Sequence, residues 1–551
     1  MYKRQEFPFR HPDELSSKET ADSHSDKDPV QVKVDWQGLA QRLWQVPVPS
    51  GNYGSLQLND NGLYLKQWSL DGRQQDVKFI KFDNLSPKLE TFADDVKGYQ
   101  LSEDGKKMFL FKGTGSGQML IVDAGEKISK DLEHAKVLLD GWQLAINPQL
   151  EWRQMFDDAW LMHRESFFDK KMRGVDWQAT KAKYQPLLAR VTDRHELADI
   201  FTQMMGELDA LHSQVRGGDF AIDPQAPEPA ALGARLTQTK DGVVISHIYR
   251  NDPELPQQAS PLAQPGVDVT DGDIITHFNG RKIANLADIT ALLRNQADKQ
   301  VLLQIQRGKQ SHKIVVKPVS LNDDNQLRYL DWVYHNAAKV SDASQGKIGY
   351  LHLYAMGAED INNFAREFYA NYDKQGLIID VRRNRGGNID SWIIEKLLRK
   401  AWAFWQPTHG TPNANMQQTF RGHLVVLTDQ LTYSDGETFS AGIKALGIAP
   451  LIGKRTAGAG VWLSGRNRLT DGGMARVAEY PQYAMDGRWI VEGRGVSPDI
   501  EVDNLPFATF QGQDAQLQKA LVYLQDKLKS DPVPPLQGVM PARGEALPVR
   551  P

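Results

Sequence analysis

The stretch GLIIDVRRNRGGNID, residues 376 to 390, decides the fold class of this chain. It joins a short apolar run to a glycine-rich loop, and a helical pattern follows from Asp390 to Trp402. A short apolar run bounded by a turn is typical of a buried strand. The same alternation occurs in the flanking sequence, namely KIGYLHL (347–353), a helical pattern over 359–372, HLVVLTD (423–429), a helical pattern that begins near Asp435, and APLIGKR (449–455). Strands that alternate with helices predict an α/β core with a mostly parallel sheet.

The sequence before this core shows three other patterns. Residues 11–30 are polar and without period, so we expect 1–30 to be a disordered tail or linker. Asp-Gly and Asn-Gly steps between short apolar runs predict antiparallel hairpins over 31–145, as in the blades of a larger β-array. Apolar residues at three- and four-residue spacing predict packing helices over 150–220.

A peptide-binding module is predicted between the helices and the core. Within 228–320, the run GDIITHFNG followed by NLADITALL resembles a PDZ module, which binds a peptide as an added strand at a sheet edge. The α/β core then occupies 321–508, and 509–551 holds a helix and a proline-rich, disordered end. We therefore expect a multidomain α+β protein.

Length and composition limit the function classes. The chain has 551 residues, which predicts three to five domains, and its formal net charge of −4 gives no sign of a nucleic-acid partner. The absence of cysteine excludes thiolate catalysis and cysteine-ligated zinc, and we expect no metal and no cofactor. No apolar window suits a membrane helix or a signal peptide, so we expect no membrane contact and a cytoplasmic location. If the chain is part of a longer one with a leader upstream, the expected location becomes periplasmic.

Two loops of the predicted core lie where ligands bind in α/β folds, at the carboxyl ends of parallel strands. In the first, the backbone N–H groups of Gly386 and Gly387 can approach a ligand as half of an oxyanion hole, although a lone Gly-Gly is more often a tight turn. The second is LTYSDGETFS (431–440), where Ser434 stands at a strand-to-helix turn, as a nucleophile would. The N–H of Asp435 would point at the same spot. This stretch alone favours an ordinary helix N-cap.

A serine nucleophile needs a base, and His212 in GELDALHSQVRGGDF is the candidate. It follows a predicted helix in a loop that ends in Gly-Gly. Glu492 in RWIVEGRGVSPDIEV, before a glycine-rich turn, is the candidate carboxylate that orients the base. Taken singly, a histidine of this kind is more often a packed or exposed residue, and a glutamate of this kind a surface charge.

The stretches GELDALHS, DVRRNRGGN, YSDGETFSAGIKALGIAPLIGKRTAG and VEGRGVSPDIEV together resemble the tricorn protease family, a branch of the C-terminal-processing peptidases. The resemblance implies that 31–145 is the end of a β-propeller and that the core has the spiral fold of ClpP and crotonase. It implies Ser434 as the nucleophile, His212 as the general base and Glu492 as part of the relay that orients the base. It also implies an oxyanion hole made by the N–H of Asp435 with that of Gly386 or Gly387.

The chain departs from the family's pattern beside the base. The family's relay has a second serine immediately before the histidine, where this chain has Leu211, and Ser213 on the other side could substitute. The serine-lysine branch of the superfamily has its lysine where this chain has Ala459, and Lys454 lies earlier, in a predicted strand. We therefore expect His212, and not a lysine, to be the general base.

The leading hypothesis is a serine peptidase that hydrolyses short or unfolded peptides. Residues 396–428 contain no Asp or Glu, and AWAFWQP (401–407) is apolar and aromatic, so we expect a hydrophobic or permissive pocket rather than a preference for basic residues. The alternatives are a catalytically impaired PDZ-type peptide-binding scaffold, favoured by Leu211, and an esterase. The resemblance also implies a homo-oligomer, a hexamer built from dimers.

Overall fold

The structure, a computed structural model, describes residues 36–538 except 44, 47, 70, 71, 73, 84–86, 114–116, 140, 142, 221, 222 and 224. These residues form two compact units that divide between Ala145 and Ile146. The predicted tail over 1–30 and the proline-rich end from 539 onward lie outside the described residues. Within the described part, no helix combines the length and the apolar composition that crossing a membrane requires.

The first unit is built from antiparallel strands. They are β1 (Asn52–Asn59), β2 (Gly62–Trp68), β3 (Gln75–Lys81), β4 (Leu89–Ala93), β5 (Val96–Leu101), β6 (Lys107–Lys112) and β7 (Gln118–Asp123). β1–β4 form a four-stranded sheet in chain order, β5–β7 form a three-stranded one, and both pack around one apolar core. The predicted hairpins are confirmed, with Gly105 at φ 67° in the turn between β5 and β6. Propeller blades are four-stranded sheets of this kind, but the assignment of this unit to a propeller stays a prediction.

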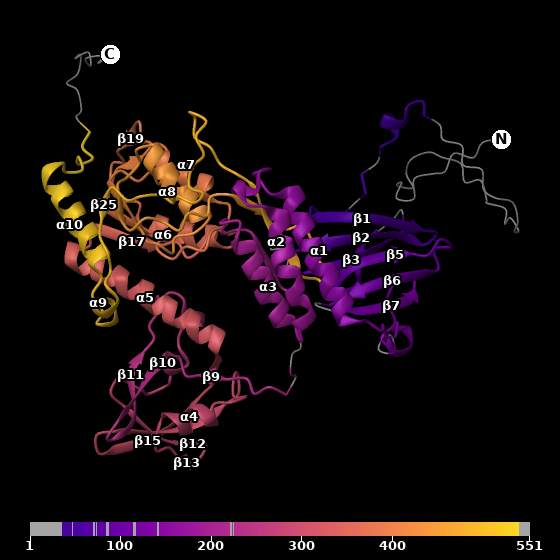
Figure 1. Cartoon of the computed structure of the whole chain (residues 1–551), viewed down its shortest axis with the longest axis horizontal. Helices are drawn as coiled ribbons and strands as arrows, with labels where there is room; N and C mark the ends of the chain where they lie inside the picture. The colour runs from indigo at the N-terminus through magenta and orange to yellow at the C-terminus, as the bar shows by residue number, and fades with distance from the viewer. Residues whose placement is uncertain are drawn as a thin grey trace, which may run out of the picture. The chain divides into compact units, whose positions relative to one another are not determined.

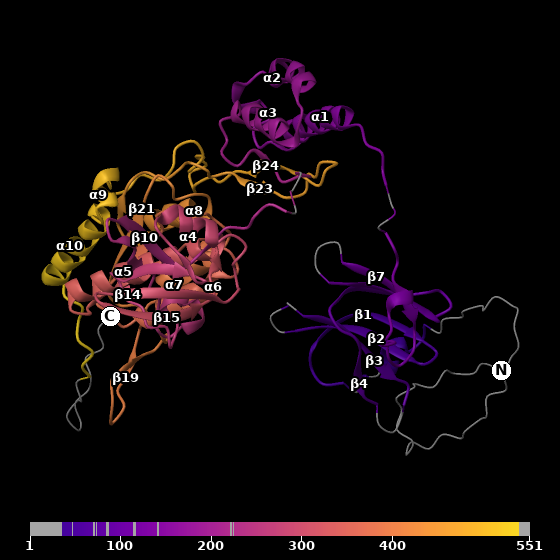
Figure 2. The ribbon, with the colours of Figure 1, turned by 90° about the horizontal axis from the view of Figure 1, so that it is seen from below.

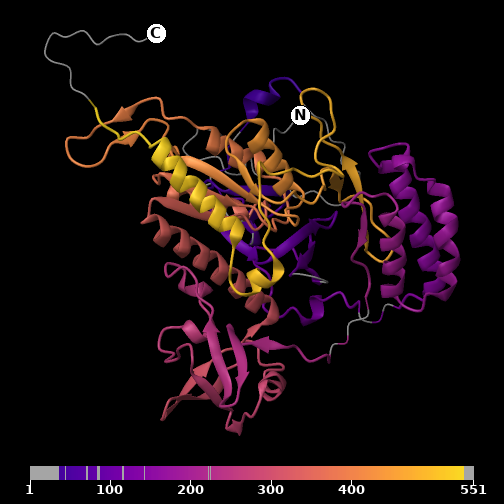
Figure 3. The same ribbon diagram turned by 60° about the vertical axis from the view of Figure 1, so that its left-hand side comes forward.

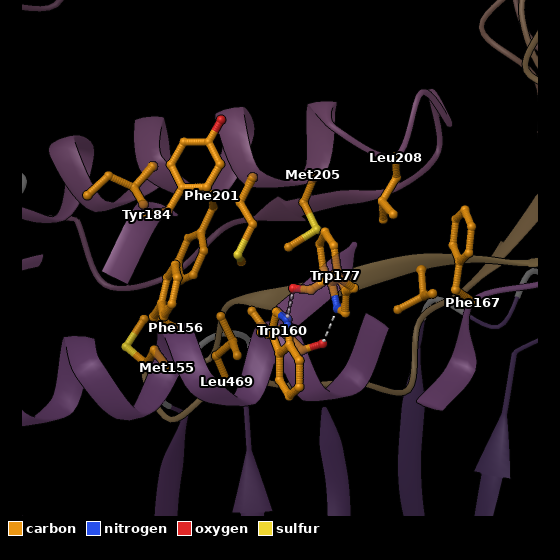
Figure 4. Packing of buried hydrophobic residues seen from close by; sticks show 14 of the residues in the cluster. Met155, Phe156, Trp160, Phe167, Trp177, Tyr184, Phe201, Met205, Leu208 and Leu469 are labelled. Atoms are coloured by element: carbon orange, nitrogen blue, oxygen red, sulfur yellow. Dashed lines mark hydrogen bonds between the residues drawn. The ribbon is translucent and has the colours of Figure 1, made fainter. Parts of the chain in front are cut away.

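The second unit begins with three packed helices. They are α1 (Pro148–Ser166), α2 (Trp177–Tyr184) and α3 (Arg194–Gly206). Asn147, Asp176 and Asp193 cap them, because each side chain accepts a backbone N–H of its helix's first turn. In the core between the helices the indole N–H of Trp160 donates to the Trp177 carbonyl at 2.8 Å, and that of Trp177 donates to the Trp160 carbonyl at 3.0 Å (Figure 4). This exchange ties α1 to the start of α2.

A small antiparallel domain follows, where the sequence predicts the PDZ module. Its elements are β9 (Ala230–Ala231), β10 (Ala234–Thr239), β11 (Gly242–Ile248), β12 (Ile274–Phe278), β13 (Arg281–Lys282), α4 (Leu286–Leu292), β14 (Val301–Arg307), β15 (Gln310–Val316) and β16 (Val319–Ser320). The main sheet has the order β10-β11-β12-β14-β15, β13 pairs with β12, and β9 pairs with β16. Asn285 and Asp288 form a capping box at the start of α4. The apolar faces of this sheet and of α4 enclose their own core.

The rest of the second unit is a three-layered α/β core (Figure 1). Its elements are α5 (Leu321–Ser344), β17 (Ile348–His352), α6 (Asp360–Asn371), β18 (Gly376–Asp380), α7 (Asp390–Leu398), β19 (Phe404–Trp405), β20 (Asn413–Ala414), β21 (His423–Thr428), α8 (Asp435–Ala445), β22 (Leu451–Gly453), β25 (Ile500–Glu501), α9 (Pro506–Phe510) and α10 (Ala515–Ser530). The sheet β17-β18-β21-β22-β25 is parallel throughout, which confirms the predicted parallel core. Helices α6, α7 and α8 pack on one face, while α5 and α10 cover the other, and Figure 3 shows α10 in yellow across the orange strands.

Two helices of this core differ from the prediction. The long helix α5 has no counterpart among the predicted elements, because polar residues dominate it and its only buried large apolar side chains are those of Leu327 and Val340. Helix α7 ends at Leu398 and not at Trp402, since Arg399 already has an extended backbone that leads into the β19–β20 hairpin.

A three-stranded antiparallel sheet joins distant parts of the second unit. It consists of β8 (Gln214–Arg216), β24 (Met474–Tyr480) and β23 (Trp462–Ser464), with β24 in the middle. Figure 2 shows β23 and β24 extending from the core beside α1 to α3, and Val461, Leu469 and Val477 complete the apolar core of those helices. The segment just before β8, which contains His212, is therefore held next to the strands that extend from the α/β core.

Candidate active site

Ser434 lies at the turn between β21 and α8. It is the N-cap residue of α8, with φ 57° and ψ −120°, and its side chain is partly exposed. A positive φ is strained for a residue other than glycine, and such strain is concentrated at functional sites. A sharp strand-to-helix turn of this kind presents a serine hydroxyl at the carboxyl end of a sheet. Ser434 is therefore a helix cap at a turn that would also suit a nucleophile, so the two alternatives that the sequence left do not exclude each other.

The carboxylate of Glu437 holds this turn in place. Glu437 is fully buried and accepts hydrogen bonds from the N–H of Ser434 at 3.1 Å, the hydroxyl of Thr456 at 2.6 Å, and the N–H groups of Gly458 and Ala459 at 2.6 and 2.7 Å. Burial raises the pKa of Glu437 above its ordinary value, and these donors offset part of the increase. Glu437 is not among the residues predicted from the sequence, although Ser-x-x-Glu is the signature of a capping box whose glutamate reaches back to the N-cap N–H.

The glycine loop after β18 lies directly against Ser434. A Cβ atom on Gly386 would lie 2.4 Å from Ser434 Cβ and 2.8 Å from Ser434 Oγ, and the φ of Gly386 is 83°. Only glycine fits this position. The N–H of Gly386 donates to the side-chain oxygen of Asn384 at 2.8 Å, and the backbone carbonyl of Asn384 accepts the N–H of Tyr433 at 3.0 Å. The buried Asn384 therefore joins the glycine loop to the serine loop.

Two backbone N–H groups at this junction, those of Gly387 and Asp435, have no acceptor among the described residues. Gly387 cannot carry a side chain, because a Cβ atom would lie 1.8 Å from the carbonyl oxygen of Met356. The sequence left Gly386 and Gly387 as alternatives, and since Asn384 already binds the N–H of Gly386, only that of Gly387 is available. Two N–H groups that lack an acceptor and lie beside a serine can stabilise an oxyanion.

The side chain of Asp435 has a separate, buried set of contacts. Its Oδ2 atom accepts the N–H groups of Ile389 at 2.8 Å and Asp390 at 3.1 Å, so it fastens α8 to the start of α7. Burial, and next the neighbouring carboxylate of Asp390, raises the pKa of Asp435 to about 7. No local sequence pattern indicated this contact, because it depends on where two helices begin in space.

His212 is buried beside the serine loop. Its ring lies 4.8 Å, between centroids, from the ring of Tyr433, the residue before Ser434. Burial, and next the positive charge of Arg476, lowers the pKa of His212 to about 4, so its imidazole is neutral near pH 7. Nδ1 of His212 is buried without a hydrogen-bond partner, and in the described part no hydrogen bond joins His212 to Ser434. The structure thus brings the predicted base to the serine loop without a hydrogen bond to Ser434 among the described residues.

Glu492 and His212 both contact the backbone of Val461. Its Oε2 accepts the N–H of Val461 at 2.8 Å, and its Oε1 lies 3.5 Å from Nη1 of Arg173. A hydrogen bond to the backbone of the same Val461 raises the pKa of His212 against the effect of burial. Burial raises the pKa of Glu492, while the N–H groups of Val461 and Gly460 and the charge of Arg173 lower it. Glu492 therefore reaches the base through Val461 and not by direct contact.

The residues on either side of the base have other contacts. Ser213 is buried, and its hydroxyl oxygen accepts the N–H of Ala478 at 3.4 Å, across the β8–β24 sheet. Leu211 is half exposed, and its carbonyl accepts the hydroxyl of Tyr433 at 3.1 Å. In the described part no hydrogen bond joins Ser213 to His212 or Glu492. A relay role for Ser213 stays a prediction that these contacts do not support.

The position of the lysine disfavours a serine-lysine dyad. Nζ of Lys454 forms an ion pair with Glu501 at 2.7 Å, and Ala459 donates its N–H to Glu437. Among the residues that the structure describes, no group of histidines and carboxylates could hold a metal ion. The residues near Ser434 include the residue types that acyl transfer by a serine and a histidine requires.

The aromatic segment at 401–407 does not form a closed pocket within the single chain. Trp402, Phe404 and Trp405 are all exposed, on or next to the β19–β20 hairpin, and Arg421 lies over the ring of Phe404 at 4.9 Å. The predicted hydrophobic or permissive specificity stays a prediction.

Three family descriptions match successive parts of the chain. Residues 148–206 match the tricorn protease C1 domain, residues 230–321 the tricorn protease PDZ domain and residues 347–502 peptidase family S41. The PDZ prediction is thereby confirmed, and the peptidase match contains both the glycine loop and the serine loop.

Named relatives extend the similarity over most of the chain. Tricorn protease homolog 1 of Streptomyces coelicolor is 31% identical over 521 residues, which cover 91% of this chain and 48% of the relative. The tricorn protease of Thermoplasma volcanium is 27% identical over 504 residues, with coverage of 90% and 48%. A crystal structure of the tricorn protease superposes with a TM-score of 0.79 at 27% identity and covers 88% of this chain and 47% of its own. The chain spans about half the length of these relatives.

Proposed function

The chain belongs to the tricorn protease family of serine peptidases, and on that premise we propose that it hydrolyses peptide bonds through an acyl-enzyme formed on Ser434. One observation carries the proposal. The strained turn at Ser434 packs against Gly386, and the N–H groups of Gly387 and Asp435 beside it have no acceptor. A turn of this kind orients a hydroxyl and an oxyanion site toward the same point.

The reaction proceeds in two halves. His212 accepts the proton of the Ser434 hydroxyl while the oxygen attacks the peptide carbonyl, and the resulting oxyanion accepts the N–H groups of Gly387 and Asp435. His212 then donates the proton to the leaving amine, which releases the new amino terminus. Water attacks the acyl-enzyme by the same route in reverse, with His212 as the base, and releases the new carboxyl terminus.

The base and the nucleophile must approach each other during the reaction. Among the described residues no hydrogen bond joins the two side chains, and such bonds commonly shorten only when substrate is bound. A neutral imidazole is the form that the first step requires, and the low pKa of His212 provides it. Glu492 acts as a positioning residue, because its bond to Val461 N–H fixes the segment that contacts His212.

Because the chain spans about half of its relatives' length, its substrates, its assembly and its location are proposals as well. We propose short or unfolded peptides as substrates, a homo-oligomer of the hexameric kind that the family resemblance implies, and a cytoplasmic location. Sedimentation of the purified chain tests the assembly, and cell fractionation tests the location.

Active-site labelling tests the proposed function. A fluorophosphonate probe should form an adduct at Ser434, located by mass spectrometry of peptides, and the wild-type chain should hydrolyse a mixture of unstructured peptides. Ser434→Ala should abolish both, whereas Ser497→Ala, at an exposed serine of the same core, should change neither. Peptide binding without any adduct or hydrolysis would instead support the non-catalytic scaffold.

A further inference from the structure

Arg383, in the turn that leads to the glycine loop, has a backbone conformation that is unfavourable for a residue with a side chain. Its φ is 58°. The N–H of Asn384 donates to the carbonyl of Val381 at 3.1 Å, so Arg383 is the third residue of a tight turn. A positive φ at this place in a turn favours glycine. Strain of this kind persists only where the surrounding contacts enforce it, and it is concentrated at functional sites.

The residues on both sides of Arg383 are fixed by buried contacts. The guanidinium of Arg382 is buried and forms an ion pair with Asp380 at 2.7 Å. The side-chain N–H of Asn384 donates to the carbonyl of Leu353 at 2.7 Å. Because both neighbours are fixed, the conformation of Arg383 depends on what its own backbone N–H binds.

The carboxylate of Asp429 binds this N–H. Asp429 follows β21 directly and is almost fully buried, and its Oδ1 atom accepts the N–H of Arg383 at 2.9 Å. The same oxygen accepts the N–H of Leu431 at 3.1 Å, in the loop that leads to Ser434. Hydrogen bonds to a charged acceptor are stronger than those between neutral groups. One carboxylate oxygen therefore joins the serine loop to the strained turn before the glycine loop.

Thr432 makes a second connection between the same two loops. It is fully buried, its hydroxyl donates to the carbonyl of Val381 at 2.9 Å, and its hydroxyl oxygen accepts the N–H of Asp429 at 3.1 Å. The N–H of Thr432 donates to the carbonyl of Asp429 at 3.0 Å. Two residues before Ser434, the chain is thus fixed to the residue at which the turn of Arg383 begins.

We propose that Asp429 is a positioning residue of the oxyanion hole, which holds the strained turn at Arg383 so that the N–H of Gly387 points to the place where the hydroxyl of Ser434 attacks. This inference rests on the proposed function and adds a residue to its machinery. Asp429 acts here through the backbone of the two loops. Because the oxyanion forms only in the transition state, loss of Asp429 should reduce kcat and leave KM nearly unchanged.

The experiment compares the transition state with the ground state. Asp429→Ala should reduce kcat about 100-fold, the effect of removing one oxyanion donor. Asp429→Asn, whose amide oxygen can still accept the N–H of Arg383, should keep part of the activity. A peptidyl trifluoromethyl ketone, which adds the hydroxyl of Ser434 to its carbonyl, should lose affinity in proportion to kcat/KM. The affinity of an uncleaved peptide, measured by calorimetry in the Ser434→Ala chain, should be the same with and without Asp429→Ala.

A second substitution tests whether the strain at the turn is the cause. Glycine adopts a positive φ at little cost, so Arg383→Gly in the Asp429→Ala chain should restore kcat about tenfold. Gln345→Gly is the matched control, because Gln345 has a φ of 53° at the C-terminal end of α5. It relieves the same kind of strain outside the turn and should not restore kcat. If Asp429→Ala fails to fold, Asp429→Asn with and without Arg383→Gly makes the same comparison.

The possible failures have different meanings. Wild-type kcat in a folded Asp429→Ala chain, or equal rescue by Arg383→Gly and Gln345→Gly, would overturn the inference and leave the peptidase proposal standing. A fall in kcat without the matching loss of inhibitor affinity would do the same. A wild-type chain that neither hydrolyses peptides nor binds the inhibitor would contradict the proposed hydrolysis, and the positioning role of Asp429 with it.

Discussion

Gly386 and Ser434 are in such close contact that a methyl group on the glycine would lie 2.4 Å from the Cβ atom of the serine. The two residues follow neighbouring strands of the parallel sheet, β18 and β21, whose carboxyl ends lie side by side. Asn384 bonds to both loops, and Glu437 bonds to the N–H of Ser434, so the serine is held from two directions. This packing fixes the hydroxyl with respect to the unoccupied N–H groups of Gly387 and Asp435.

Replacement of Gly386 by alanine should inactivate the enzyme without unfolding it. The added methyl group would push Ser434 aside, and a displacement of about 1 Å from a reactive geometry can reduce kcat by about 100-fold. Gly512→Ala is the matched control, because Gly512 has the same φ of 83° but nothing within 4 Å of the added atom. Peptide hydrolysis and circular dichroism of both variants make the comparison. Wild-type kcat in a folded Gly386→Ala chain would show that this contact does not control the nucleophile.

Glu437→Gln should reduce both stability and kcat. The carboxylate accepts four hydrogen bonds, and an amide would turn an N–H group toward some of the same donors. Leaving buried donors unsatisfied costs about 1 to 3 kcal/mol, so we expect the free energy of unfolding to fall by about 2 kcal/mol and kcat to fall at least about tenfold. Urea unfolding and peptide kinetics measure the two effects. Glu395→Gln, at an exposed glutamate on α7, should change neither.

The pH dependence of kcat/KM should have its acidic limb near pH 4. In the proposed mechanism His212 accepts a proton in the first step and must be neutral, and its pKa is lowered to about 4 by burial and by Arg476. Above this pH the base is available, and below it kcat/KM should fall about tenfold per pH unit, because kcat/KM reports the free enzyme. A profile on a neutral peptide, at pH values where circular dichroism shows a folded chain, makes the measurement. A limb near 6.5, the ordinary value for histidine, would show that another base acts or that His212 is solvated.

The decline of kcat/KM at alkaline pH should result from the ionisation of Asp435. Its carboxyl group has a pKa raised to about 7, so it is protonated below that pH and ionised above it. Ionisation places a negative charge on the residue whose N–H is proposed to bind the developing oxyanion, so kcat/KM should decline as the pH rises through about 7. Asp435→Asn, which cannot ionise, should remove the decline, whereas Asp486→Asn, at an exposed position, should retain it. An unchanged alkaline limb in Asp435→Asn would assign the decline to another group.

Several parts of the site could be predicted because they depend on short stretches of sequence. Ser434 and the glycine pair follow apolar runs that are typical of buried strands, and parallel strands place their following loops at one edge of the sheet. The contact of Glu437 with the N–H of Ser434 could also have been predicted, since its spacing from Ser434 is that of a capping box. By contrast, the sequence could not predict whether Gly386 or Gly387 has a free N–H, because this depends on which N–H the side chain of Asn384 binds.

The sequence by itself determined the order of the parts, the parallel core and the two loops that carry the serine and the glycines, because local apolar periodicity and turn residues decide which segments are buried. Only the tertiary structure decided the rest. The pairing of β8 with β24 brings His212 to the serine loop, and the packing of α7 against α8 buries the carboxyl group of Asp435. These features determine the pKa values of the site. They arise from contacts between residues far apart in the chain, for which no local pattern in the sequence exists.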